Sequence, residues 1–249
     1  MKGHIYAFDS LRGIFAIFVA YSHFLGSLYG WVDYPFKGAF LAVDFFFILS
    51  GVVLTLAYKE KFLTGKLDFS DFMLIRLFRL YPLHVITMIL TAIAMSFSII
   101  NGSFSLDKLP FDDVLDHTIL NLLLLNGIGI PPLGWSFNEP SWSISVEYWV
   151  GCLLLPIILN VKVEYKILLA FIFYSFLFYV GGLPQNNNVF GFINISILRG
   201  VAAFLLGNVI YEISLKKDNK KTLMNDKLII VKGGGNTYSN ITLNHFSIL

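Results

Sequence analysis

Residues 8–28, FDSLRGIFAIFVAYSHFLGSL, form an apolar run of membrane-spanning length that carries Arg12 near its start and His23 eleven residues later. About 20 apolar residues suffice to cross a bilayer as a helix. Eleven steps of about 100° return almost to the starting direction, so both side chains fall on one stripe, about 16 Å apart along the helix. Ionisable groups inside a span normally face a bundle interior or a water-filled path. The stripe therefore predicts a functional site.

The composition is typical of an integral membrane protein. Of the 249 residues, 56% are hydrophobic and only 14% are charged, whereas roughly a quarter of the residues in a soluble domain are charged. The net charge of +2 gives no reason to expect nucleic acid as a partner. The single cysteine, Cys152, excludes an intrachain disulfide. The first apolar run is too long for a signal peptide and lacks a cleavage site, so we expect it to be a retained span.

Hydropathy predicts an all-α, polytopic transmembrane helix bundle of about six spans. They are expected near residues 8–29, 38–57, 81–100, 142–160, 166–181 and 192–213. The run 114–125 is interrupted by Asp116 and His117 and ends in glycines and prolines, which indicates a short or re-entrant loop helix. With a cytoplasmic N-terminus, fifteen of the 18 basic residues fall in cytoplasmic sections. This asymmetry predicts that orientation.

The character of the sequence changes after residue 214. The segment 215–249 opens with a run of charges, contains a glycine triplet and has no span. We therefore expect a membrane domain over residues 1–214 and a poorly ordered tail of aberrant or truncated character over residues 215–249.

Three titratable side chains from three predicted spans reach a similar depth below the outer surface: His23, Asp44 and Glu147. A histidine with carboxylate partners is the usual composition of a general base and its orienting groups. We expect these three residues to be catalytic, with the acids orienting His23. The alternative is structural, a satisfied interior histidine with acids that neutralise and lock the bundle. Arg199, also within a span, is expected to have a structural or lipid role.

Arg76 and Arg79, in IRLFRLYP, are three residues apart and share one helix face at the cytoplasmic entrance of the third span. Two guanidinium groups there suit the phosphates of a cytosolic donor, which they would bind through paired hydrogen bonds. Topological anchoring and contact with lipid headgroups fit the spacing equally well. Ser50 and Gly51 are small enough to permit close helix approach. No metal site is expected.

Four segments together resemble the acyltransferase family 3 membrane enzymes: FDSLRGIFAIFVAYSHF, VDFFFILSG, RLFRLYP and PSWSISVEYW. That family includes bacterial O-acetyltransferases of surface polysaccharides, peptidoglycan and nodulation factors. The first segment has the family's arginine–histidine pattern at Arg12 and His23, and the third has its paired arginines at Arg76 and Arg79. The resemblance implies that His23 is catalytic. It also implies that Arg12, Arg76 and Arg79 are essential in handling an acyl-CoA donor.

The resemblance further implies an enzyme that transfers an acetyl or other acyl group from cytosolic acyl-CoA to a glycan hydroxyl outside the membrane. It would be a multi-pass protein of the bacterial inner membrane with no bound cofactor. Its partners would be acyl-CoA, a glycan or lipid-linked saccharide, and the lipid bilayer. Family members usually have more spans, so a C-terminally truncated member is expected. Two other functions stay open: an inactive remnant or interaction subunit, and a proton-coupled transporter or flippase.

Overall fold

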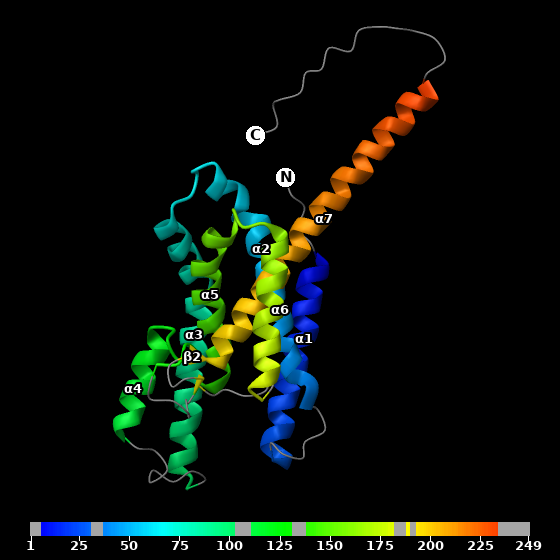
Figure 1. Cartoon of the computed structure of the whole chain (residues 1–249). Coiled ribbons are helices and arrows are strands. Elements are labelled where there is room, and N and C mark those ends of the chain that lie inside the picture. Colours follow the sequence, from blue (N-terminus) through cyan, green and yellow to red (C-terminus); the bar gives the residue numbers. More distant parts are fainter. Residues whose placement is uncertain are drawn as a thin grey trace. The chain divides into compact units, whose positions relative to one another are not determined.

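The computed structural model describes residues 6–30, 37–102, 111–130, 138–181, 188–189 and 193–233. Over these ranges the chain is almost entirely helical, which confirms the predicted all-α fold class (Figure 1). The helices are α1 (Tyr6–Tyr29), α2 (Leu41–Leu63), α3 (Phe69–Ile100), α4 (Phe111–Leu122), α5 (Trp142–Ile158), α6 (Val163–Tyr179) and α7 (Ile195–Gly233). The 3-10 turns η1 (Lys37–Phe40) and η3 (Glu139–Ser141) precede α2 and α5. Two short strands, β1 (Asn188–Val189) and β2 (Ile193–Asn194), pair antiparallel.

Several helices have the length and composition of membrane spans. Among the described residues, three helical stretches are long and apolar enough to cross a bilayer: Gly38–Leu63, Phe69–Ile100 and Ile195–Lys217. The helix α5 is apolar but shorter. These helices confirm a membrane bundle. The count of six spans and the cytoplasmic N-terminus stay predictions.

Two helices extend more than ten residues beyond their predicted bounds. The helix α3 starts at Phe69, twelve residues before the predicted start of the third span, and continues through Pro82 without a break. Membrane helices tolerate an internal proline because their surroundings satisfy the freed backbone groups. The helix α7 runs on to Gly233, so residues 215–233 are helical where a poorly ordered tail was expected. Residues 234–249 of that predicted tail lie outside the described residues.

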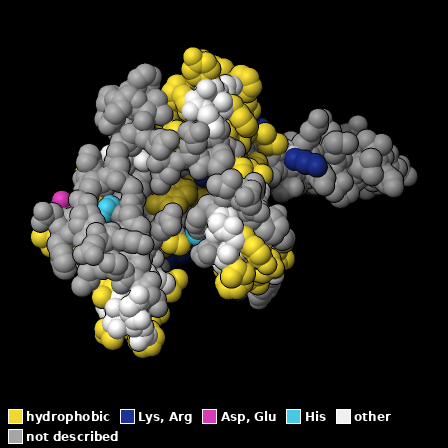
Figure 2. All heavy atoms as spheres, turned by 90° about the horizontal axis from the view of Figure 1, so that it is seen from below, with side chains coloured by type: hydrophobic (Ala, Val, Ile, Leu, Met, Phe, Trp, Pro, Cys, Tyr) yellow, Lys and Arg dark blue, Asp and Glu magenta, His cyan; other side chains and the backbone are white. Residues whose placement is uncertain are grey.

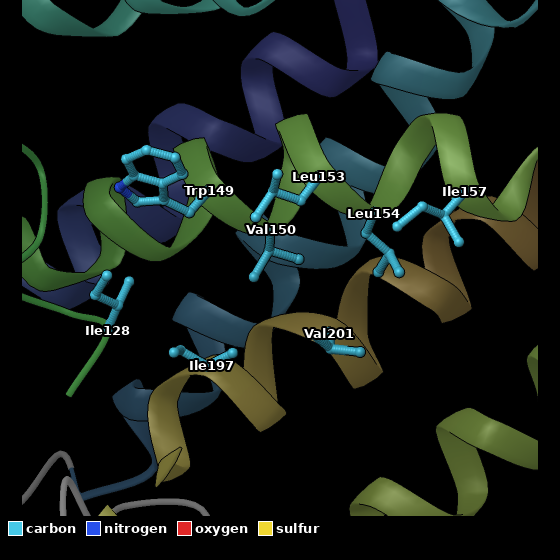
Figure 3. A pocket seen from close by; sticks show the side chains of 8 residues that line it. All are labelled: Ile128, Trp149, Val150, Leu153, Leu154, Ile157, Ile197 and Val201. Carbon is cyan, nitrogen blue, oxygen red and sulfur yellow. The ribbon is translucent and has the colours of Figure 1, made fainter. Parts of the chain in front are cut away.

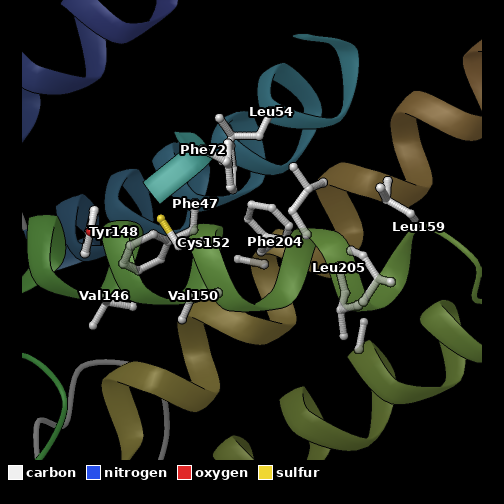
Figure 4. Close-up of a cluster of buried hydrophobic side chains, with 14 of the residues drawn as sticks. Phe47, Leu54, Phe72, Val146, Tyr148, Val150, Cys152, Leu159, Phe204 and Leu205 are labelled. Carbon is white, nitrogen blue, oxygen red and sulfur yellow. The ribbon is translucent and has the colours of Figure 1, made fainter. Parts of the chain in front are cut away.

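Backbone contacts divide the chain into two units, Met1–Tyr211 and Glu212–Leu249. In the first unit, α5 is the central helix and packs against both α2 and α3, while α1 packs on α2. Almost fully buried side chains in this core come from Leu54, Phe72, Cys152 and Phe204, on four different helices (Figure 4). Van der Waals packing of this kind is a main source of helix association in a bilayer, where the lipid is itself apolar.

The outer faces of the helices are apolar as well. Only 11% of the most apolar window of α3 is buried, and Ile93, Phe97 and Ile100 expose most of their side chains. Figure 2 shows hydrophobic side chains over much of the described surface at one end of the molecule, with few charged ones among them. Such faces are suited to contact with lipid rather than with water.

The helices α2 and α7 cross at a pair of glycines, Gly51 and Gly207. A Cβ added to Gly51 would collide with the backbone of Phe204 and approach the Cα of Gly207. A Cβ added to Gly207 would collide with the backbone of Ile48. Small residues allow two membrane helices to approach this closely, and the role expected of Gly51 is confirmed.

Replacing Gly51 by alanine should therefore destabilise the bundle by about 1 to 3 kcal/mol, because two backbones must separate to admit one methyl group. The measurement is the unfolding midpoint of the purified protein in detergent. Gly13→Ala on α1 is the matched control, since a Cβ there meets no atom within 4 Å. Equal midpoints for the two variants would contradict the close crossing.

Candidate functional site

The helix α1 carries Arg12 and His23 on the face that turns toward α2. The helix is continuous from Tyr6 to Tyr29, so the two side chains keep the separation of about 16 Å that helical geometry gives. Phe15, one turn beyond Arg12, packs its ring against Phe45 of α2 at a centroid distance of 4.2 Å. Arg12, Phe15 and His23 are each partly buried. The stripe therefore faces the bundle and not the lipid.

Arg12 also has a local ion-pair partner. Its Nη1 atom lies 3.6 Å from Oδ1 of Asp9, three residues earlier, and the two side chains are 32% and 49% exposed. An ion pair with this exposure contributes little to stability, about 0 to 1 kcal/mol. The guanidinium of Arg12 thus remains accessible at its end of α1.

Asp44, on α2, binds Arg199 of α7 through both carboxylate oxygens. The Nε and Nη2 atoms of Arg199 donate to Oδ1 and Oδ2 at 2.9 and 2.6 Å. Nη2 also donates to the backbone oxygen of Phe40 at 2.6 Å. The rings of Phe40 and Trp142 lie 5.7 and 5.8 Å from the guanidinium carbon. This buried, bidentate pair joins the first turn of α2 to α7, and it accords with the structural role expected of Arg199.

Glu147, on α5, binds two donors through a single oxygen. Nη2 of Arg76, on α3, donates to Oε1 at 3.1 Å, and the hydroxyl of Ser50, on α2, donates to the same oxygen at 3.2 Å. Arg76 is 2% exposed, whereas the Glu147 side chain is 27% exposed. Three helices therefore meet at one carboxylate, and part of that carboxylate remains accessible.

Arg79 has a different environment from Arg76, although it lies one turn further along α3. Its side chain is exposed, and no ion pair or hydrogen bond joins it to another described residue. An exposed guanidinium without an acidic partner is free to bind an anion. The two arginines that the sequence predicts to act together thus occupy a buried and an exposed position.

The structure brings together some of the predicted site residues. Arg76, predicted to bind the donor, meets Glu147, predicted to be catalytic, while Asp44 is held by Arg199. The prediction that Asp44 and Glu147 orient His23 stays a prediction. Among the described residues, no cluster of three or more His, Cys, Asp or Glu side chains is placed to hold a metal ion.

A buried polar network near the start of α6 was missed by sequence reasoning. Lys166 is fully buried and donates to Oδ1 of Asn208 at 2.7 Å, and Nδ2 of Asn208 donates to Thr55 at 2.8 Å. The network links α6, α7 and α2. Its signal in the sequence is Asn208, an amide inside an otherwise apolar span, because such groups form hydrogen bonds across membrane helices.

A second buried polar cluster joins α3 to the last turn of α4 and to the segment between α4 and α5. Nε2 of His84 lies 2.8 Å from the backbone oxygen of Asn121, and Ser141 donates to Oδ1 of the same asparagine at 2.9 Å. Asn126 donates to Ser141 at 2.8 Å. The position of α4, predicted as a short loop helix, is thereby set by polar contacts that reach the middle of α3.

An apolar pocket of about 300 Å³ lies between α5 and α7 (Figure 3). Its walls include Ile128, Trp149, Leu153, Ile157 and Ile197. The indole N–H of Trp149 donates to the backbone oxygen of Leu124 at 2.8 Å and is therefore already satisfied. The pocket lacks groups for acid–base chemistry and is distinct from the Glu147 site.

The family assignment agrees with this architecture. Residues 5–232 match the acyltransferase family 3 model, which is described as an acyltransferase domain. The chain belongs to this family of membrane acyltransferases, and the resemblance carried by the four segments is confirmed. The match covers α1 to α7 and reaches beyond residue 214.

Two curated relatives are similar in sequence. "Protein 2 in picA locus" of Rhizobium radiobacter is 30% identical over 157 residues, which cover 57% of this chain and 76% of that protein. "Acyltransferase MdmB" of Streptomyces mycarofaciens is 32% identical over 111 residues, which cover 43% of this chain and 25% of that protein. No solved structure matches the chain significantly.

Proposed function

We propose that the chain moves an acetyl or related acyl group from cytosolic acyl-CoA to a hydroxyl of an extracytoplasmic or lipid-linked glycan. The observation that carries this proposal is the stripe of α1, on which Arg12 and His23 are separated by about 16 Å on the face toward the bundle. A separation of that size within a membrane domain suits an enzyme whose donor and acceptor come from opposite sides.

In the proposed reaction, His23 accepts the proton of the acceptor hydroxyl as its oxygen attacks the thioester carbonyl. The carbon–sulfur bond breaks, the CoA thiolate leaves, and the proton passes from the imidazolium to that thiolate. In the alternative order, a His23 ring nitrogen attacks the thioester first and carries the acyl group to the hydroxyl. Either order produces one ester and one free CoA thiol.

The proposed topology places the N-terminus in the cytoplasm and the protein in the bacterial inner membrane as a multi-pass protein. Arg79 would then face the cytoplasm, where the phosphates of acyl-CoA are available to an exposed guanidinium. His23 would lie near the outer surface, where a glycan hydroxyl arrives. No resident cofactor takes part in this scheme.

The test uses inner-membrane vesicles of known orientation that contain the full chain, supplied with acetyl-CoA labelled in the acetyl group. We expect the label to appear in a lipid-linked or surface saccharide, with one free thiol released per ester formed. Vesicles without the chain are the control. Absence of transfer from any short acyl-CoA would contradict the proposed function, and proton-coupled solute uptake by the same vesicles would point to a transporter instead.

A further inference from the structure

The contacts of Glu147 are confined to one of its two carboxylate oxygens. Arg76 and Ser50 both donate to Oε1, at 3.1 and 3.2 Å. No hydrogen bond joins Oε2 to another described residue, and it is not among the buried side-chain atoms that lack a partner. Since the side chain is 27% exposed, Oε2 is accessible and able to accept a further hydrogen bond.

Arg76 is bound too deeply to serve an anion from the cytosol. Its side chain is 2% exposed and its Nη2 is engaged by Glu147. Its Nε–H is buried and has no hydrogen-bond partner among the described residues. To reach a phosphate, Arg76 would have to leave Glu147 and expose its guanidinium, which would strand a carboxylate inside the bundle. A carboxylate that is partly buried in a helix bundle is unfavourable without its cationic partner.

We propose that Arg76 is a positioning residue: with Ser50 it holds Glu147 through Oε1, so that Oε2 accepts a hydrogen bond from a substrate N–H or O–H, and Arg79 alone of the two arginines meets the donor's phosphates. This inference rests on the proposed function. The two arginines, three residues apart on one helix, then have different roles. The buried Arg76 acts through a carboxylate, and the exposed Arg79 binds an anion.

Ser50 helps Arg76 to hold the Glu147 carboxylate. Its hydroxyl is buried on α2, next to the crossing with α7, and it approaches Oε1 of Glu147 from a different helix than Arg76 does. Two donors from two helices determine the direction of a carboxylate better than one, because each restricts a different rotation of the side chain. A carboxylate held in this way is preorganised for a substrate contact.

The test compares two donors, acetyl-CoA and S-acetylpantetheine, which has the same thioester and amides but lacks the phosphates. For Arg79→Gln, the loss of kcat/KM should be about tenfold larger with acetyl-CoA than with S-acetylpantetheine, since a charge-assisted contact to phosphate is removed. For Arg76→Gln, kcat should fall by about tenfold to hundredfold equally with both donors, and the KM for acetyl-CoA should stay within about twofold of wild type. Arg76→Lys should recover part of that loss.

A double variant tests whether Arg76 acts through Glu147. Arg76→Gln/Glu147→Gln should be no slower than Glu147→Gln alone, because the carboxylate that Arg76 positions is already gone. Ser50→Ala leaves the ion pair in place and covers the case in which Arg76→Gln fails to fold. It should lower kcat several-fold, with the KM for both donors unchanged. Lys162→Gln, which removes an exposed charge next to α6, is the control for loss of one positive charge.

The outcomes separate the two levels of the proposal. Suppose that wild type transfers acetyl from acetyl-CoA and that Arg76→Gln mainly raises KM, and only for acetyl-CoA. Arg76 is then a phosphate ligand, and the inference is overturned. The inference is also overturned if the kcat loss of the double variant equals the product of the losses of Arg76→Gln and Glu147→Gln. A folded wild type that neither binds CoA nor transfers acetyl from either donor contradicts the proposed function itself. Direct measurement of CoA binding tests the two roles without turnover. Weaker binding by Arg79→Gln but not by Arg76→Gln supports the inference.

Discussion

Replacing His23 by alanine should abolish acyl transfer while leaving the protein folded in the membrane. If His23 is the general base or the acyl carrier, its loss should lower kcat by about 10²- to 10⁴-fold or more. The side chain is only partly buried on α1, a helix that packs mainly on α2. Removing an imidazole at such a position should therefore change stability little. The measurement is the initial rate of label transfer in vesicles, normalised to the amount of inserted protein.

The matched control is Phe24→Ala, the next residue along α1, whose side chain is 60% exposed. It removes an aromatic ring from the face that turns away from the bundle and should retain most of the activity. Equal activity of His23→Ala and wild type would contradict the proposed mechanism. A His23→Ala protein that no longer inserts would instead assign this histidine to folding.

Removing one partner of the Asp44–Arg199 pair should destabilise the bundle by about 3 to 5 kcal/mol. Each residue has less than a tenth of its side chain exposed, and the two form two hydrogen bonds. Asp44→Asn leaves the Arg199 guanidinium buried beside a neutral amide, and Arg199→Met leaves a buried carboxylate. Both variants should lower the unfolding midpoint in detergent. Asp9→Asn breaks the exposed pair with Arg12 and should cost no more than about 1 kcal/mol.

A double variant separates the structural role of Asp44 from the catalytic role predicted for it. Asp44→Leu/Arg199→Met removes both charges at once and should restore much of the lost stability, because hydrophobic side chains of similar volume often replace a buried pair without loss. If the stable double variant still transfers acyl groups, Asp44 is structural. If it is stable and inactive, Asp44 acts in catalysis as the depth argument predicted.

The helices were the part of the fold most open to prediction. The apolar runs predicted α1, α5 and α6 nearly at their observed bounds, because a bilayer requires a helix wherever about 20 apolar residues occur together. The helix α2 was predicted to end at residue 57 but continues to Leu63. The start of α3 was predicted too late. Hydropathy identifies the residues that lie in lipid, from about residue 81 onward. The helix itself begins at Phe69, because backbone hydrogen bonding continues through the amphipathic residues before the span.

The candidate site was predictable as a set of residue types but not as a set of pairs. Depth along the spans placed Asp44, Glu147 and His23 at similar levels. It could not show that Arg199, 155 residues away in sequence, would take both oxygens of Asp44. Nor could depth distinguish Arg76 from Arg79, because residues three apart lie on the same face of a helix at nearly the same depth. Burial against α5 separates the two in space.

By itself, the sequence determined that this protein is a helical membrane protein, that Arg12 and His23 share one stripe, and that the chain resembles acyltransferase family 3. These features depend on local periodicity and on short motifs, which are properties of neighbouring residues. The tertiary structure is needed to show which carboxylate each buried arginine binds, and that one oxygen of Glu147 accepts from both donors. In a low-dielectric interior each buried charge requires a partner, and packing selects that partner among helices far apart in the chain.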